Sequence, residues 1–369
     1  MGMLKQKDSN SGGALAVLGA GAWGSALAGL QASNFSRVGL FAQEADSAEE
    51  ITRFHSNERY LDGVRLPANV FAWSSLERTL EGASTVIVAV PSHASRSVAR
   101  DVLALTGPRT RIVLATKGLE QDTGLLSIEV WRQEIAAAGA SGRRRHRDPL
   151  VLSGPNLARE ISHGMPAVSC VAAESAAQVG RAIQRLSHPL LTLVPFHDPV
   201  GVQAAGALKN VYAVGCGMAS ALEWGDNATA ALIWRGLEET SRFVLALGGD
   251  PAVATTPAGV GDLVATCTSP LSRNHDLGKM ISGAVNGSEE VRGVREGART
   301  ASEALRRGRA LGIEMPLLEA VALVMSGIRK PETVLEAACG APRRAHAFSY
   351  AAAVRTFLPV QRGMGVATE

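Results

Sequence analysis

The sequence has few aromatic residues, little net charge and no long apolar run. Aromatic side chains make up 4% of the chain, which disfavours a stacking platform for single-stranded nucleic acid. The formal net charge of +3 is too small to indicate nucleic-acid binding. No uninterrupted apolar run reaches the roughly 18 to 20 residues that span a bilayer, and the polar start lacks a signal-peptide core. We therefore expect no nucleic-acid partner and no membrane insertion.

Cysteine is also scarce. The four cysteines stand far apart, without the paired spacing of a zinc site or a disulfide framework: Cys170, Cys216, Cys267 and Cys339. We therefore expect no bound metal, and a cytoplasmic protein with reduced thiols.

Glycine is abundant, with 39 residues in a chain of 369, and favours tight turns and close backbone packing. At roughly 150 residues per domain, the length predicts two domains. Residues 14–199 alternate short apolar strands with helices, which predicts an α/β Rossmann-type domain with a mostly parallel sheet covered on both faces. Residues 200–356 are rich in alanine and leucine without strand alternation, which predicts an all-α domain. We expect a flexible N-terminus (1–13) and a loose tail (357–369).

One basic stretch runs from Arg143 to Arg147, between a predicted helix and a predicted strand. We interpret it as a solvated loop, because runs of like charge are usually exposed. An anion-binding patch is the competing interpretation.

The first chemical motif is a glycine-rich turn with Gly19, Gly21 and Gly24, between a predicted strand and a predicted helix. The first glycine permits the tight turn, the second lets the backbone approach a pyrophosphate, and the third allows close helix–strand packing. The helix N-terminus then offers free N–H groups to the phosphates. This context predicts dinucleotide binding.

Cofactor choice should depend on the end of the second strand, at Gln43 and Glu44. An acid about 20 residues after the turn can bind the ribose 2′-hydroxyl of NAD, whereas an arginine suits the 2′-phosphate of NADP. Glu44 stands at that spacing with no arginine next to it in the sequence, which favours NAD. Glu44 can equally be a solvated loop acid, so NAD and NADP both stay open.

Two lysines occupy apolar surroundings, Lys117 after a predicted strand and Lys209 within a helix of small apolar residues. Burying an ammonium group is costly, so each needs a partner or a ligand. Burial and a second cation would lower the pKa of a catalytic lysine, although each could also extend to solvent. Asp262 begins a predicted helix, where it could cap the helix or act in a site. Arg273 and Asn274 together suit an anionic group.

Taken in order, these motifs resemble the bacterial NAD(P)-dependent glycerol-3-phosphate dehydrogenase family. The resemblance covers about residues 14–340. Its stretches are GAGAWGSALA (19–28), NERYLDGVRLP (57–67), VPSHA (90–94), TKGLE (116–120), SGPNLARE (153–160), GVQAAGALKNVYAVGCGM (201–218), GDNATAALIWRGLEE (225–239), LGGDP (247–251), GVGDLVATCTSPLSRN (ending at Asn274) and EMP (314–316).

The resemblance implies an oxidoreductase that reversibly reduces dihydroxyacetone phosphate to sn-glycerol 3-phosphate with NAD or NADP, for glycerophospholipid synthesis. Lys209 would be the proton donor and acceptor, with Lys117 and Asp262 beside it. The implied substrate-binding residues are Lys117, Gly154, Asn156, Lys209, Asp262, Ser272, Arg273 and Asn274. The implied cofactor-binding residues outside the glycine turn are Trp23, Lys117, Ala158, Arg273, Val294 and Glu296. We also expect a homodimer, although no sequence feature fixes the oligomeric state.

The chain departs from the family pattern at several positions. Asn156 stands where Ser or Thr is usual, Leu157 where Phe is usual, and Ser220 with Ala221 where Asp-Gly is usual. A paralogue that reduces a related phosphorylated ketone therefore stays open. So do two functions outside this family: a β-hydroxyacid or ketopantoate-type reductase, which needs a carboxylate-binding site, and a dinucleotide sensor without turnover.

Overall fold

The computed structural model describes residues 13–142, 146–283 and 292–340, with the backbone alone for 292–298. Its strands are β1 (Ala14–Leu18), β2 (Val38–Phe41), β3 (Ser56–Asn57), β4 (Leu61–Arg65), β5 (Val70–Trp73), β6 (Ala83–Val88), β7 (Arg111–Leu114), β8 (Leu150–Ser153), β9 (Ala167–Ala172) and β10 (Leu191–Phe196). Its α-helices are α1 (Ala22–Gln31), α2 (Ala45–Phe54), α3 (Leu76–Leu80), α4 (Ser95–Leu105), α5 (Ser127–Ala140), α6 (Ala158–Ser162), α7 (Ala176–Leu186), α8 (Pro199–Ala221), α9 (Gly225–Ala246), α10 (Asp262–Thr268), α11 (Arg273–Ile281), α12 (Arg292–Ala310), α13 (Pro316–Met325) and α14 (Glu332–Cys339).

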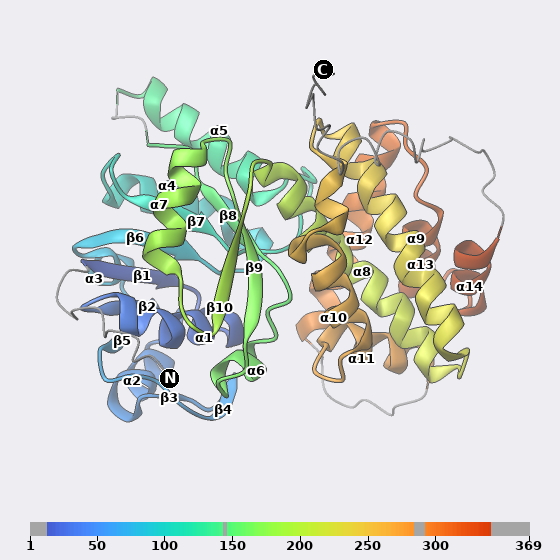
Figure 1. Ribbon diagram of the computed structural model, residues 1–369, viewed down its shortest axis with the longest axis horizontal. Helices are drawn as coiled ribbons and strands as arrows, with labels where there is room; N and C mark the ends of the chain where they lie inside the picture. The colour runs from blue at the N-terminus through green and yellow to red at the C-terminus, as the bar shows by residue number, and fades with distance from the viewer. Residues whose placement is uncertain (1–12, 143–145, 284–291, 341–369) are drawn as a thin grey trace, which may run out of the picture. The chain divides into compact units, whose positions relative to one another are not determined.

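Eight strands form one sheet in the order β10-β9-β8-β7-β6-β1-β2-β5 (Figure 1). All neighbouring pairs are parallel except β8 and β9, which run antiparallel. The predicted mostly parallel sheet is thus confirmed. In a parallel sheet, functional groups gather at the carboxyl ends of the strands. Lys117 follows the carboxyl end of β7, and Gly19 follows that of β1.

Both faces of the sheet are buried, as the alternation along β1 demonstrates. Leu15 and Val17 pack in one apolar cluster with Leu27 of α1. Ala16 and Leu18 pack in a second cluster on the other face, which continues into the helical part of the chain through Leu208 of α8. The strand is therefore apolar throughout rather than alternating, which is typical of a sheet covered on both sides.

Helix α8 is the centre of the helical part. Its 23 residues are buried around nearly the whole circumference, and it packs against α9, α10 and α11. Close approach to α11 depends on glycine, since a Cβ at Gly217 would lie 1.9 Å from the backbone oxygen of His275. No helix within the described residues is both long and apolar enough to cross a membrane.

The sequence does not predict every element. The two-stranded sheet β3–β4 and the edge strand β5 fall in a stretch where the apolar pattern indicates no strand. The change from strands to helices occurs where β10 ends at Phe196 and α8 begins at Pro199. The division into two domains, with its boundary at residue 199, stays a prediction. The predicted loose ends fall almost entirely outside the described residues.

Candidate active site

Two lysines converge on one buried carboxylate. The Nζ atom of Lys117 lies 2.7 Å from Oδ2 of Asp262, and the Nζ atom of Lys209 hydrogen-bonds to Oδ1. Asp262 is 1% exposed, and the side chain of Lys209 is 11% exposed. Two ammonium groups share one carboxylate in low dielectric, so the cluster carries an excess positive charge. Such a cluster favours an anionic ligand or a negative charge that develops during a reaction.

The surroundings of Lys209 perturb its protonation. Burial lowers the pKa of Lys209 to about 8, since desolvation penalises the ammonium form. The Asp262 carboxylate opposes this shift, and the Lys117 ammonium reinforces it. A group with a pKa near the working pH can both donate and accept a proton.

Local sequence places each member of this cluster. Lys117 comes three residues after β7, and its Nζ also donates to the Gly154 carbonyl at 3.2 Å. Gly206 lets α8 approach β8, because a Cβ there would lie 2.6 Å from Oγ of Ser153. That approach positions Lys209, one turn further along α8, beside the loop that follows β7.

Asp262 is the first residue of α10 and directly follows a π-helical turn, Pro257–Gly261. Its side-chain oxygens accept from the two lysines, and Gly261 occupies the N-cap position without a side-chain cap. The capping interpretation of Asp262 is therefore wrong. Such π-helical turns are frequent at functional sites.

Sequence reasoning missed Thr266, which belongs to this cluster. Its Oγ1 accepts from Nζ of Lys209 at 2.8 Å and donates to the backbone oxygen of Asp262 at 2.6 Å. The available signal was spacing, because residues four apart on a helix lie on one face. With Asp262 and Thr266 as acceptors, the ammonium of Lys209 can direct its third proton to a ligand.

The residues predicted to bind substrate divide into two groups. Gly154 is buried, and a Cβ there would lie 2.4 Å from the Val168 backbone oxygen, so only glycine fits. Asn156 is committed elsewhere, since its amide exchanges hydrogen bonds of 2.8 and 3.0 Å with Oγ of Ser169. Gly154 therefore contacts the lysine cluster through its carbonyl, whereas no hydrogen bond joins Asn156 to that cluster among the described residues.

The predicted anion-binding residues lie at the start of α11. Asn274 donates to Oδ1 of Asn210 at 3.0 Å, which links it to the residue after Lys209. The Ser272 hydroxyl caps α11 by accepting from the backbone N–H of His275. Arg273 is exposed, and no ion pair holds it within the described part of the chain. Its guanidinium is therefore available for an anionic ligand, and the Ser272 hydroxyl keeps its proton to donate.

The glycine turn between β1 and α1 fits a dinucleotide. Gly19 adopts φ +111°, a conformation that strongly favours glycine. A Cβ at Gly24 would lie 1.8 Å from the Gly19 oxygen, so this glycine permits the turn to close on the helix. A Cβ at Gly21 would meet nothing within 4 Å, so this position faces open space where phosphates can approach the backbone.

Side chains around the turn also suit a cofactor. The Nε1 atom of Trp23 is buried without a hydrogen-bond partner in the described structure, and such an unsatisfied donor suits a ligand acceptor. Trp23 and Ala158 pack on one small apolar cluster with Leu61. Val294 and Glu296 lie in the first turns of α12, and their side chains fall outside the described residues.

Gln43 and Glu44 lie between the end of β2 and the start of α2, and both are exposed. Glu44 lies 2.6 Å from the guanidinium of Arg59, which is 15 residues away in the sequence. No arginine is next to Glu44 in the sequence, but the fold places Arg59 beside it. Glu44 suits a ribose hydroxyl and Arg59 suits a phosphate, so the site offers a group for either cofactor.

Comparison with known proteins identifies this architecture. Models of the N-terminus and the C-terminus of NAD-dependent glycerol-3-phosphate dehydrogenase match residues 14–179 and 198–336. The chain belongs to the NAD-dependent glycerol-3-phosphate dehydrogenase family. It is 41% identical over 325 residues to a glycerol-3-phosphate dehydrogenase [NAD(P)+] of Sinorhizobium fredii, an alignment covering 87% of this chain and 94% of the relative. The family resemblance drawn from the sequence is thus confirmed.

Solved structures agree. A glycerol-3-phosphate dehydrogenase crystal structure from Coxiella burnetii matches with a TM-score of 0.80 and 32% identity, over 88% of this chain and 98% of that one. A probable 2-dehydropantoate 2-reductase from Bacillus subtilis matches with a TM-score of 0.50 and 12% identity, over 86% and 100%. The second likeness shows a shared fold alone. The predicted combination of a Rossmann-type part and a helical part is therefore confirmed.

Proposed function

We propose that this protein reduces dihydroxyacetone phosphate reversibly to sn-glycerol 3-phosphate, with NADH or NADPH as the hydride donor. The observation that carries the proposal is the pair of lysines on Asp262. A ketone that accepts a hydride at carbon becomes an alkoxide, and an ammonium beside that oxygen stabilises charge present mainly in the transition state. The product would supply the glycerol phosphate unit of glycerophospholipids, as the family implies.

The bound nicotinamide supplies the hydride, and the protein supplies position and a proton. Lys209 donates a proton from Nζ to the substrate oxygen as the carbonyl carbon gains the hydride, and takes it back in the reverse direction. Asp262 and Thr266 hold the Nζ atom, which fixes the direction of its free N–H bond. Lys117 adds positive charge without a second proton transfer.

The substrate phosphate would bind at the start of α11. Arg273 offers a forked guanidinium for a phosphate, and Asn274 an amide beside the lysine cluster. Binding of the phosphate by these two residues would convert binding energy into orientation of the ketone beside the lysine cluster. The turn with Gly19, Gly21 and Gly24 would hold the cofactor pyrophosphate.

A spectrophotometric assay tests the proposal. NADH and NADPH oxidation is followed with dihydroxyacetone phosphate at matched concentrations, and with 2-keto and 3-keto acids for comparison. We expect oxidation with the phosphorylated ketone and none with the keto acids. Oxidation with a keto acid alone would instead establish a β-hydroxyacid-type reductase, and cofactor binding without oxidation would establish a sensor.

We further propose that the protein acts in the cytoplasm as a homodimer. Four dispersed cysteines, of which three are buried and free, support a reducing compartment. Exposed Trp234 (57%) and Ile328 (67%) offer apolar surface that an association could cover. Analytical ultracentrifugation measures the oligomeric state, and a monomer across the micromolar range would exclude the dimer.

A further inference from the structure

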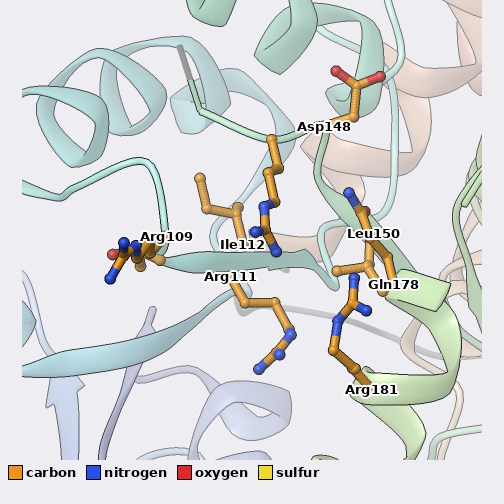
Figure 2. Close-up of a pocket in the computed structure, with 9 residues that line it drawn as sticks. Arg109, Arg111, Ile112, Asp148, Leu150, Gln178 and Arg181 are labelled. Carbon is orange, nitrogen blue, oxygen red and sulfur yellow. The ribbon is translucent and has the colours of Figure 1, made fainter. Parts of the chain in front are cut away.

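Four arginines line a pocket at the amino end of β7: Arg109, Arg111, Arg147 and Arg181 (Figure 2). The pocket is small and partly open to solvent. The arginines come from separate parts of the chain, since Arg109 precedes β7, Arg111 begins it, Arg147 precedes β8 and Arg181 lies on α7. The fold therefore brings Arg147 and Arg181 to the neighbouring pair Arg109 and Arg111.

These positive charges are not balanced locally. Among the described residues, no ion pair joins any of the four to a carboxylate. Asp148 is the one acidic residue among the described lining residues, and its Oδ2 lies 3.1 Å from Nε of Arg132 instead. Figure 2 shows its carboxylate oxygens turned away from Arg111 and Arg181.

Arg111 is the most constrained of the four. It is partly buried, and its guanidinium donates to the neutral Oγ1 of Thr85 at 3.2 Å. Burial lowers the pKa of Arg111, and the nearby charges of Arg181, Arg185 and Arg147 lower it further. A partly buried cation among other cations is costly unless an anion compensates it.

We propose that this pocket is a phosphate-binding site for a small phosphorylated molecule, separate from the candidate active site. All four cations in the lining are arginines, and guanidinium groups bind phosphate oxygens in a forked geometry. Four arginines around one small, partly open pocket suit a single phosphate group rather than a whole dinucleotide.

The position of the pocket separates it from catalysis. Arg111 begins β7, whereas Lys117 follows the carboxyl end of the same strand. The two sites therefore lie at opposite edges of the sheet. For the stretch Arg143–Arg147, the sequence allows two interpretations, a solvated loop and an anion-binding patch. Of that stretch, Arg147 contributes to the pocket, His146 is buried, and residues 143–145 fall outside the described structure.

Titration calorimetry with inorganic phosphate, at fixed ionic strength, tests the proposal on the full chain. The double variant Arg111→Gln with Arg181→Gln removes two charges at the pocket. The matched control, Arg53→Gln with Arg329→Gln, removes two exposed charges elsewhere. Losing charge-assisted hydrogen bonds should weaken phosphate binding by about ten- to a hundredfold in the first variant and leave the control unchanged.

A third variant, Arg273→Gln, separates this site from phosphate bound at the candidate active site. It should retain the phosphate site that the arginine pocket provides. The proposal is overturned if Arg273→Gln abolishes all phosphate binding, or if the folded pocket variant binds phosphate as tightly as the parent protein. Thermal unfolding without phosphate checks that the variants fold. If the double variant does not fold, the single variant Arg181→Gln, on an exposed helix surface, takes its place in the titration.

A phosphate group could also belong to a lipid, so co-sedimentation with phosphatidylglycerol vesicles is compared with titration by free phosphate. We expect free phosphate to bind and the vesicles to sediment no more of the parent protein than of the pocket variant. Vesicle binding that depends on Arg111 and Arg181, without binding of free phosphate, would overturn the soluble ligand in favour of a lipid headgroup.

Discussion

Replacing Asp262 with asparagine should shift the pH dependence of catalysis rather than only lower the rate. The Asp262 carboxylate raises the pKa of Lys209 against the effect of burial, and the pKa in the parent protein is about 8. Loss of an adjacent opposite charge moves a pKa by about 1 to 3 units. A shift of about 2 units, in the middle of that range, would lower the pKa of Lys209 to about 6 in Asp262→Asn.

The size of the effect follows from the protonated fraction of Lys209. At about pH 7.5, a group with a pKa of about 8 is roughly three quarters protonated, and one with a pKa of about 6 is only about 3% protonated. Ketone reduction needs the protonated lysine, so kcat/KM at that pH should fall roughly 25-fold and recover as the pH is lowered toward about 6. Oxidation of the alcohol needs the neutral lysine, so its rise with pH should occur at lower pH than in the parent protein.

The assay is kcat/KM in both directions across the pH range, since this parameter reports the pKa values of the free enzyme. Thr266→Val is the matched control, because it removes a hydrogen bond from Lys209 without removing charge. Its pH profile should shift much less. A loss in Asp262→Asn that is the same at every pH would refute the reasoning, and would mean that Asp262 orients Lys209 without setting its pKa.

Three further results are expected. Lys209→Ala should lower kcat by several orders of magnitude while fluorescence titration shows nearly normal NADH binding, and activity within a few-fold of the parent would exclude the proton-transfer role. Gly21→Ala should weaken cofactor binding without changing the melting temperature of the free protein, because a Cβ at residue 21 meets no atom of the protein. Gly24→Ala should instead lower the free energy of unfolding by about 3 kcal/mol, because a Cβ at residue 24 clashes with the backbone oxygen of Gly19. Burial raises the pKa of Glu239 from 4.5 to about 7, so the folded state binds the extra proton and stability should fall by roughly 3 kcal/mol as the pH rises through that window. Denaturant unfolding at several pH values should show this slope in the parent protein and a flatter one in Glu239→Gln.

The sequence predicted the glycine turn well because the constraint is local. Gly19, Gly21 and Gly24 are read from spacing, and a strand before them and a helix after them complete the signal. The parallel sheet was equally accessible, since its apolar strands are short and bounded by turns. Strand β5 was missed because its pairing with β2 depends on contacts across the sheet rather than on its own pattern.

The candidate site could be predicted residue by residue but not as an arrangement. Lone lysines in apolar segments need a partner, which singles out Lys117 and Lys209, and the family resemblance implies that Asp262 lies beside Lys209. Neither predicts that both lysines bind the two oxygens of this one carboxylate. Asp262 could equally have capped a helix, and only the fold decides between the two uses. The family resemblance implies that Ser272 binds substrate, and the structure adds that its hydroxyl accepts the capping hydrogen bond of α11. Long-range contacts of this kind are not encoded in local pattern.

Helix α8 has a further consequence for how the chain is made. Its 23 residues would extend about 34 Å, enough to span a bilayer. Lys209 is the eleventh of them, close to the midpoint, where a lysine disfavours insertion into a membrane by about 3 kcal/mol. During synthesis, before the partner helices are present to bury it, this segment would expose mostly small apolar residues. The ammonium group to which we assign proton transfer would thus also disfavour insertion of this helix into a membrane during synthesis.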